Sequence, residues 1–313
     1  MRRGPIVRRI EVEPSRAAAP VAAVSAQAYA KINLWLHVLG RRADGYHLLD
    51  SLVVFAEIGD TVVASFSPDG STSLFPLVID GPFAAALPTD RRNLVIRAAE
   101  ALAMRAGAAV SPVALRLTKR LPPASGIGGG SADAAATLKA LISLWQLSID
   151  GAELGQIALS LGADVPVCLA GRPARVGGVG ERIGPAPALP PAWFVLANPG
   201  IELATPEVFR RRSGPFSEPA QVPAALNDAP ALASLLATTG NDLTAAAIDL
   251  APQVGEVLAA LAALDGALIA RMSGSGATCF AMFAEGERAE AGAARLRAAH
   301  ANWWITAAAM LRG

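Results

Sequence analysis

The chain has 313 residues, of which 53% are hydrophobic and 17% are charged. This length and composition favour two folded domains with substantial cores and exclude an intrinsically disordered chain. The formal net charge is +1, so no overall electrostatic attraction to nucleic acid or to an anionic membrane is expected. Local groups must therefore hold any anionic ligand.

The cysteines, the histidines and the start of the chain suggest a soluble, cytoplasmic protein without a transition-metal site. Cys168 and Cys279 lie far apart in apolar surroundings, which favours two unreactive thiols in a reducing compartment. The three histidines have no metal-ligand spacing with either cysteine. No run of about 20 apolar residues is free of charges, Pro or Gly, so no membrane span is expected. Residues 1–20 lack an apolar signal-peptide core, and we expect them to form a mobile tail.

The first predicted elements are three antiparallel strands. Apolar residues occupy every even position from 28 to 38, which predicts a strand with one face on a core and a polar face opposite. Lys31 and Asn33 both fall on the polar face and should point the same way. After a turn at residues 41–45, an apolar strand over 48–58 is expected to turn at Gly59-Asp60 into a third strand, TVVASF.

Helices then alternate with further strands. In chain order the patterns predict a helix over 90–106, a strand over 113–117, a glycine-rich loop over 121–133, a helix with an apolar stripe over 138–145, and another ending at Gly162 as its C-cap. The stretch from Gly171 to Pro191 is dense in Gly and Pro and is the predicted domain junction. We place the domains at residues 21–182 and 183–313.

The second half of the chain reads as an alternation of strands and helices. The predicted order is a strand over 193–197, a helix opened by Thr205-Pro206, helices over 242–250 and 254–264, a hairpin over 267–283, a helix over 289–300 and a last strand. Antiparallel strands with helices packed on one side favour two α+β sandwiches.

The strongest functional signal is the glycine-rich loop, LPPASGIGGGSAD. It lies between a predicted strand and a helix, where free amides and the helix dipole favour an anion and glycines allow a phosphate to approach the backbone. Ser131 is placed either as the helix N-cap or as a hydroxyl donor to a phosphate or Mg²⁺. The dinucleotide fingerprint fails because Ser131 replaces its third glycine, and the Walker A pattern fails for want of lysine. A merely flexible turn is the competing interpretation.

Three further signals are weak when each is taken alone. Asp164 follows a predicted helix end, where an aspartate more often caps backbone amides. Lys31 lies on a mainly apolar strand, where a lysine is more often solvated at its tip. The segment SGSGAT, residues 273–278, is explained equally well by a hairpin turn and by an anion-binding nest.

Together these signals resemble the galactokinase, homoserine kinase, mevalonate kinase and phosphomevalonate kinase superfamily, the GHMP kinases. Its members carry a lysine-bearing N-terminal strand, a glycine-rich phosphate loop that starts at a proline, and a C-terminal glycine-rich turn. The resemblance implies a two-domain α+β GHMP-kinase fold. Its N-terminal domain would be ribosomal-protein-S5-domain-2-like, and its C-terminal domain a ferredoxin-like α/β sandwich.

Within the superfamily, the resemblance is closest to the kinases that phosphorylate the 2-hydroxyl of a cytidine-diphosphate-linked methylerythritol in the non-mevalonate isoprenoid pathway. It runs from about residue 28 to 283 and rests on AYAKINLWLHVLGRRADGYHLLDSLV, LPPASGIGGGSADAAATLKAL, LGADVPVCLAG and SGSGATCF. The element ADGYH is the most discriminating. The resemblance implies ATP with Mg²⁺ as cofactor and a small-molecule substrate. It implies no nucleic acid, membrane or obligate protein partner, and it names no direct metal ligand.

The resemblance also assigns roles to individual residues. Asp164 would orient or deprotonate the acceptor hydroxyl, and Lys31 would hold it ionised and offset charge on the transferring group. The implied ATP-binding residues are Asn93, Lys119, Pro122, Pro123, Ala124, Ser125, Gly126, Ile127, Gly128, Gly129, Gly130, Ser131 and Ala132. The implied substrate-binding residues are Asn33 for the methylerythritol, Tyr46 and His47 for the cytidine, and Ser273, Gly274, Ser275 and Gly276 for the diphosphate.

The sequence departs from the family pattern in and after the loop. The loop begins Pro-Pro-Ala-Ser-Gly where some relatives read Pro-x-Gly-Gly-Gly, and the helix opens Ser-Ala-Asp in place of Ser-Ser-Asn. Asp133 thus adds a negative charge that supports the helix dipole or influences Mg²⁺ placement. The alternatives are another GHMP kinase, of the homoserine or mevalonate type, and a non-catalytic sensor. Tyr46-His47 argues against the first, and the Lys31 and Asp164 pair argues against the second.

Overall fold

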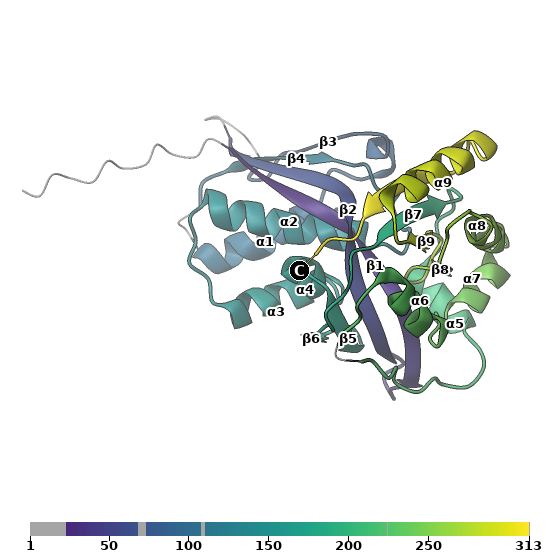
Figure 1. Ribbon diagram of the computed structural model, residues 1–313. Helices are drawn as coiled ribbons and strands as arrows, with labels where there is room; N and C mark the ends of the chain where they lie inside the picture. Colours follow the sequence, from purple (N-terminus) through teal and green to yellow (C-terminus); the bar gives the residue numbers. More distant parts are fainter. Residues whose placement is uncertain (1–22, 68–72, 108–109, 224, 313) are drawn as a thin grey trace, which may run out of the picture.

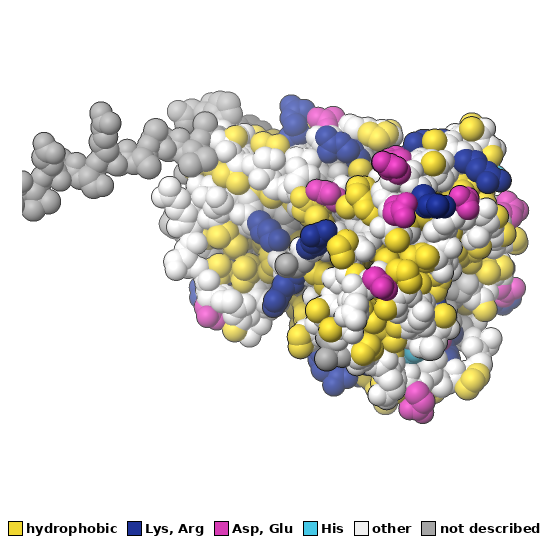
Figure 2. Space-filling view, viewed as in Figure 1, with side chains coloured by type: hydrophobic (Ala, Val, Ile, Leu, Met, Phe, Trp, Pro, Cys, Tyr) yellow, Lys and Arg dark blue, Asp and Glu magenta, His cyan; other side chains and the backbone are white. Residues whose placement is uncertain are grey.

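The computed structural model describes residues 23–67, 73–107, 110–223 and 225–312. The predicted tail, residues 1–20, lies outside them. The chain builds two β-sheets, each covered by helices, that meet along the long strand pair β1–β2 (Figure 1). None of the described helices is long and apolar enough to cross a membrane. Basic and acidic side chains are interspersed on the face in Figure 2, in keeping with a net charge near zero.

The first sheet is built around one long strand. Its six strands are β1 (Ala23–Arg41), β2 (His47–Phe66), β3 (Leu77–Asp80), β4 (Val113–Thr118), β5 (Ala174–Gly178) and β6 (Arg182–Pro185). One edge of β2 pairs with β1 along almost its whole length, and the other edge pairs with β4 at one end and β5 at the other. β3 then pairs with β4, and β6 with β5.

Four helices cover this sheet on one face. They are α1 (Leu94–Ala106), α2 (Gly129–Leu144), α3 (Gly151–Leu161) and α4 (Val165–Ala170), and the short 3-10 helix η1 (Ala84–Ala86) precedes them. Helix α2 contacts β1 and β2 directly, and the other three helices pack around it. Helix α1 begins later than predicted because Asn93 caps it, its side-chain oxygen accepting from Val95 N at 3.0 Å.

The predicted turn at Gly59-Asp60 is wrong, because β2 runs through these residues as one strand. Tyr29 pairs with Gly59 and Ala30 pairs with Ala56, so β2 carries a bulge opposite β1. A Cβ added to Gly59 would lie 2.3 Å from the carbonyl oxygen of Ala28. Glycine is therefore needed here for close backbone approach, and not for a turn.

The alternation in β1 predicted a polar face, but that face is covered. Lys31 and Asn33 are each only 4% exposed. The Lys31 N–H donates to the Ile127 carbonyl at 2.9 Å, and the Asn33 N–H donates to Ser273 Oγ at 3.1 Å. The phosphate loop and the second half of the chain both pack onto this strand, which is why its polar residues are buried.

The second sheet confirms the ferredoxin-like prediction. Its strands are β7 (Trp193–Asn198), β8 (Ile269–Met272), β9 (Cys279–Phe283) and β10 (Trp304–Ala309), antiparallel in the order β10-β7-β9-β8. The helices of this half are α5 (Thr205–Arg211), α6 (Ala229–Ala237), α7 (Thr244–Leu250), α8 (Gln253–Ala262) and α9 (Gly286–Ala299). The chain passes from the first sheet to the second between the end of β6 at Pro185 and the start of β7 at Trp193.

A buried apolar cluster joins the two sheets. Trp35 of β1 packs in it together with Phe194 of β7 and Phe280 of β9. Backbone hydrogen bonds add to this contact, since the Leu36 N–H donates to Gly240 and the Asp242 N–H donates to Leu36, each at 2.9 Å. The strand that carries Lys31 is therefore fixed by both halves of the chain.

Candidate active site

A cleft of about 780 Å³ opens where the two halves meet. It is lined by β1, the phosphate loop, the start of α4, helix α5 and the turn between β8 and β9. The predicted site residues that line it are Lys31, Asn33, Tyr46, His47, Ala124, Ser125, Gly126, Gly128, Gly129, Gly130, Ser131, Asp164, Gly274 and Ser275.

The other predicted site residues do not line the cleft: Asn93, Lys119, Pro122, Pro123, Ile127, Ala132, Ser273 and Gly276. Asn93 caps α1, and Ile127 is fully buried in the cluster between the sheets. Lys119 lies beneath the loop, where its ammonium is paired with two aspartates.

Lys31 and Asp164 meet at the edge of the cleft. Lys31 Nζ lies 2.7 Å from Asp164 Oδ2, and the Lys31 side chain is 6% exposed while that of Asp164 is 42% exposed. Asp164 precedes α4, but its side chain caps no backbone amide. The cap interpretation of Asp164 is therefore wrong, and so is the interpretation of Lys31 as a solvated lysine. A shielded cation holds a carboxylate that faces the cleft.

The phosphate loop leads directly into the N-terminus of α2. Gly128, at φ 66°, is the N-cap, so the expectation that Ser131 caps the helix is wrong. The first helical bond runs from Ala132 N to the Gly128 carbonyl at 2.8 Å. The N–H groups of Gly129, Gly130 and Ser131 precede that bond, and all three residues line the cleft. This arrangement favours an anion.

The two glycine-rich segments are in direct contact. Gly126 has φ 77°, and a Cβ added there would lie 2.5 Å from the Ser273 carbonyl oxygen. A Cβ on Gly274 would lie 2.5 Å from the Gly126 carbonyl oxygen. Ser273 Oγ accepts from Asn33 N and donates to the Gly126 carbonyl at 3.2 Å, so it joins β1, the phosphate loop and the turn.

The far end of the cleft carries aromatic and basic groups. The His47 ring stacks on Phe209 of α5 with 5.1 Å between ring centroids. Burial lowers the pKa of His47, and the nearby Arg41 and Arg212 lower it further, so the imidazole stays neutral at neutral pH. A neutral imidazole has one donor and one acceptor nitrogen.

Asn33 lines the cleft and carries a buried acceptor. Its Nδ2 donates to Ser51 Oγ at 2.8 Å, while its buried Oδ1 has no partner among the described residues. A buried amide oxygen without a partner is costly, so a ligand hydroxyl that donates to it would be favoured.

The sequence analysis missed the contribution of α5. Phe209 and Arg210 line the cleft together with Pro206. These residues stand at i, i+3 and i+4, so the helical spacing after the predicted Thr205-Pro206 start was the signal that places them on one face.

It also missed Asp60, which is fully buried on the same strand face as Val62 and Ala64. An aspartate in register with inward apolar residues signals a buried partner.

No group of three or more His, Cys, Asp and Glu side chains gathers as a metal site within the described part of the chain. Both cysteines are buried free thiols. Burial raises the pKa of Cys168 to about 12 and also raises that of Cys279, which keeps both protonated and agrees with the prediction of unreactive thiols.

Comparison with known proteins agrees with this geometry. The N-terminal domain of GHMP kinases matches residues 93–172, and their C-terminal domain matches residues 222–302. The chain is 56% identical over 287 residues to the 4-diphosphocytidyl-2-C-methyl-D-erythritol kinase of Paramagnetospirillum magneticum, covering 92% of this chain and 98% of that protein. It is 55% identical to the protein of that name from Cereibacter sphaeroides, covering 90% and 98%.

Solved structures extend the comparison to the fold. A crystal structure of 4-(cytidine 5'-diphospho)-2C-methyl-D-erythritol kinase superposes with a TM-score of 0.72 at 35% identity, covering 92% of this chain and 100% of that one. Homoserine kinase from Cytophaga hutchinsonii has a TM-score of 0.68 at 18% identity, with 96% and 98% covered, and shares the fold. The chain belongs to the 4-diphosphocytidyl-2-C-methyl-D-erythritol kinases, a family of ATP-dependent GHMP kinases.

Proposed function

We propose that this protein transfers the terminal phosphoryl group of ATP to the 2-hydroxyl of 4-(cytidine 5'-diphospho)-2-C-methyl-D-erythritol, a step of the non-mevalonate isoprenoid pathway. The observation that carries the proposal is the pair of Lys31 and Asp164, 2.7 Å apart beside the phosphate loop. The family and the cleft's mixed aromatic and basic end support the substrate.

In the proposed mechanism, Asp164 aligns the acceptor hydroxyl and accepts its proton, because its carboxylate is the part of the pair that faces the cleft. Lys31 pairs with that carboxylate and offsets negative charge on the transferring group. Phosphoryl transfer depends mainly on positioning and electrostatic stabilisation, with a carboxylate orienting the nucleophile. The free amides at the start of α2 would hold the phosphates of ATP.

We propose that Mg²⁺ enters the cleft with ATP, as part of the nucleotide substrate. Such an ion keeps much of its water and is held through substrate phosphates and one or two protein oxygens. The Ser131 hydroxyl lines the cleft at the start of α2 and is one oxygen available for it.

Beyond the phosphate loop, the substrate would meet three kinds of group. Asn33, on β1 close to Lys31, would accept from a methylerythritol hydroxyl with its Oδ1, and at the far end of the cleft the neutral His47 imidazole would bond the cytosine, beside Tyr46. Arg41 and Arg210 line this end and suit a diphosphate. These assignments explain why a cleft in a nearly neutral protein would select an anionic substrate.

A coupled ADP-release assay with Mg-ATP tests the proposal. The acceptors are the cytidyl compound, the same polyol without its cytidyl group, homoserine and mevalonate. We expect turnover with the cytidyl compound alone. Turnover with a different acceptor would keep the kinase and reject the substrate, and no turnover with any acceptor would favour a sensor.

Substitution of Phe209 tests the cytidine end separately. Because stacked rings contribute about 0.5–1.5 kcal/mol, Phe209→Ala should raise the KM for the cytidyl substrate by up to about tenfold and leave the KM for ATP unchanged. Phe216→Ala is the matched control, since this phenylalanine is exposed and lies outside the cleft. An equal effect of both variants, or a change in the ATP value, would argue against the assignment.

A further inference from the structure

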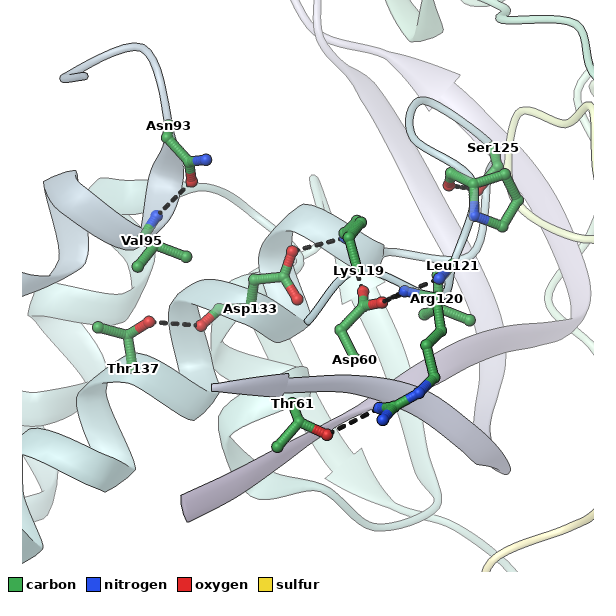
Figure 3. A network of polar contacts seen from close by, with 11 residues as sticks. Asp60, Thr61, Asn93, Val95, Lys119, Arg120, Leu121, Ser125, Asp133 and Thr137 are labelled. Carbon is green, nitrogen blue, oxygen red and sulfur yellow. Dashed lines mark hydrogen bonds and ion pairs between the residues drawn. The ribbon is translucent and has the colours of Figure 1, made fainter. Parts of the chain in front are cut away.

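Three charged side chains lie beneath the phosphate loop, and the proposed chemistry uses none of them. Lys119 Nζ lies 2.6 Å from Asp60 Oδ2 and 2.6 Å from Asp133 Oδ2 (Figure 3). Lys119, Asp60 and Asp133 are 2%, 0% and 3% exposed, and none of them lines the cleft. We call these three residues the buried triad.

The buried triad fixes both ends of the phosphate loop. Asp60 Oδ1 accepts from the backbone N–H groups of Arg120 at 2.6 Å and Leu121 at 2.9 Å, where the chain enters the loop. Asp133 lies in α2, where the chain has just left the loop. Since Lys119 bonds both carboxylates, entry and exit are tied to one buried ammonium.

The charges of the buried triad do not balance, because two carboxylates face one ammonium. Asp60 is fully engaged, with Lys119 on one oxygen and two amides on the other. Asp133 Oδ1 has no hydrogen-bond partner among the described residues. The unmatched negative charge therefore belongs to Asp133.

The protonation of the triad follows from the same geometry. Burial raises the pKa of Asp133 to about 7; Asp60 adds to the rise and Lys119 opposes it. Burial alone would lower the pKa of Lys119, but the two carboxylates outweigh it and raise that pKa, so the ammonium stays charged. The Cys168 thiol of α4 interacts electrostatically with Asp133, but it stays neutral because its pKa is raised to about 12.

We propose that Asp133 is a positioning residue that also sets the charge beneath the ATP phosphates. Through Lys119 it holds the start of α2 in place, and its own negative charge weakens the binding of nucleotide phosphates to the same helix terminus. Lys119 then supports the phosphate loop by pairing with Asp60 and Asp133, and it makes no contact with ATP. This inference rests on one part of the proposed function, the binding of a nucleotide by the phosphate loop.

The position of Asp133 also decides between the two roles that its sequence leaves open. A direct ligand of Mg²⁺ has to reach the cleft, and Asp133 is buried away from it. Asp133 lies just beyond the first turn of α2 and is buried, so its charge acts on an anion at that helix terminus through a poorly screened interior. Its effect on the nucleotide is therefore electrostatic.

The decisive variant is Asp133→Asn, which keeps an oxygen for Lys119 and removes the charge. Affinities of the full chain for ATP, ADP and adenosine are measured by calorimetric titration. We expect ATP and ADP to bind about two- to fivefold more tightly, the size of a charge–helix-dipole effect, and adenosine to bind unchanged. Asp50→Asn is the matched control, because Asp50 is a buried carboxylate of β2, the strand that also carries Asp60, and it pairs with Arg175 outside the buried triad. The ATP affinity of the Asp50→Asn variant should equal that of the wild type.

The pH dependence of the wild-type protein supplies a measurement that needs no variant. A proton on Asp133 removes its charge, so ADP should bind more tightly as the pH falls from about 8 to 6, through the pKa of Asp133. The nucleotide's own protonation works in the opposite direction. In Asp133→Asn this gain should disappear.

Unchanged or weaker ATP binding by Asp133→Asn, or a pH dependence of ADP affinity that is the same in the wild type and in Asp133→Asn, would overturn the proposal. Either result would leave Asp133 a purely structural residue. The binding data are independent of turnover, so a failure of the acceptor assay would reject the proposed substrate and leave this test intact.

Discussion

Replacing Asp164 with Asn is expected to lower kcat by about 10²–10⁴-fold, the usual contribution of general-base assistance. The amide keeps the size of the side chain but cannot take the proton of the acceptor hydroxyl, and it no longer forms the ion pair with Lys31. The free amides at the start of α2, which would bind the phosphates, are untouched. The affinity for ATP should therefore stay within about twofold.

This expectation is checked by steady-state ADP release together with ATP titration of both proteins. Asp150→Asn is the matched control, since Asp150 caps α3 by accepting from Ala152 N and Asn serves equally well at that position. A kcat for Asp164→Asn close to the wild-type value would contradict the catalytic role. Equal losses in kcat and ATP affinity would point to a collapsed loop.

Replacing Lys119 with Met is expected to lower the free energy of unfolding by about 3–5 kcal/mol, because it leaves uncompensated buried charge. The substitution preserves the length of the side chain but removes the ammonium between Asp60 and Asp133. Urea unfolding followed by tryptophan fluorescence measures the loss. The loss should shrink at acid pH, where the carboxyls take up protons.

Two further variants control this prediction. Lys139→Met removes an exposed lysine of α2 that has no such carboxylate pair and should change stability by less than about 0.5 kcal/mol. The double variant Lys119→Met with Asp133→Asn should be more stable than Lys119→Met alone, because one of the two facing charges is gone. Full stability of Lys119→Met would mean that the buried triad is not an ion-pair network.

Local signals in the sequence predicted much of the fold and the position of the loop. The strand before the loop, the helix after it and the hairpin expected over residues 267–283 all follow from periodicity and glycine placement, and the structure confirms them. Lys31 and Asn33 were expected on one face because side chains alternate in a strand, and both line the cleft. The pairing of Lys31 with Asp164 came from the family resemblance.

Local sequence patterns did not predict the contacts between segments that are distant in the chain. Gly59-Asp60 has the composition of a turn, yet the close approach of β1 requires the glycine and the buried Lys119 requires the aspartate. Ser131 has the chemistry of an N-cap, but Gly128 takes that position at a positive φ. At Gly59-Asp60 the local preference of the residues was overridden by partners far away in the sequence.

The contact between Gly126 and the turn at residues 273–278 constrains how this sequence can change over generations. The atoms that a side chain at Gly126 or Gly274 would meet first belong to the backbone of the opposite segment. A clash with a side chain can be relieved by a second substitution that shortens it, but no substitution shortens a carbonyl group. No second substitution in the facing segment can therefore relieve a side chain at Gly126 or Gly274. We expect both positions to remain glycine, although about 150 residues of chain separate them.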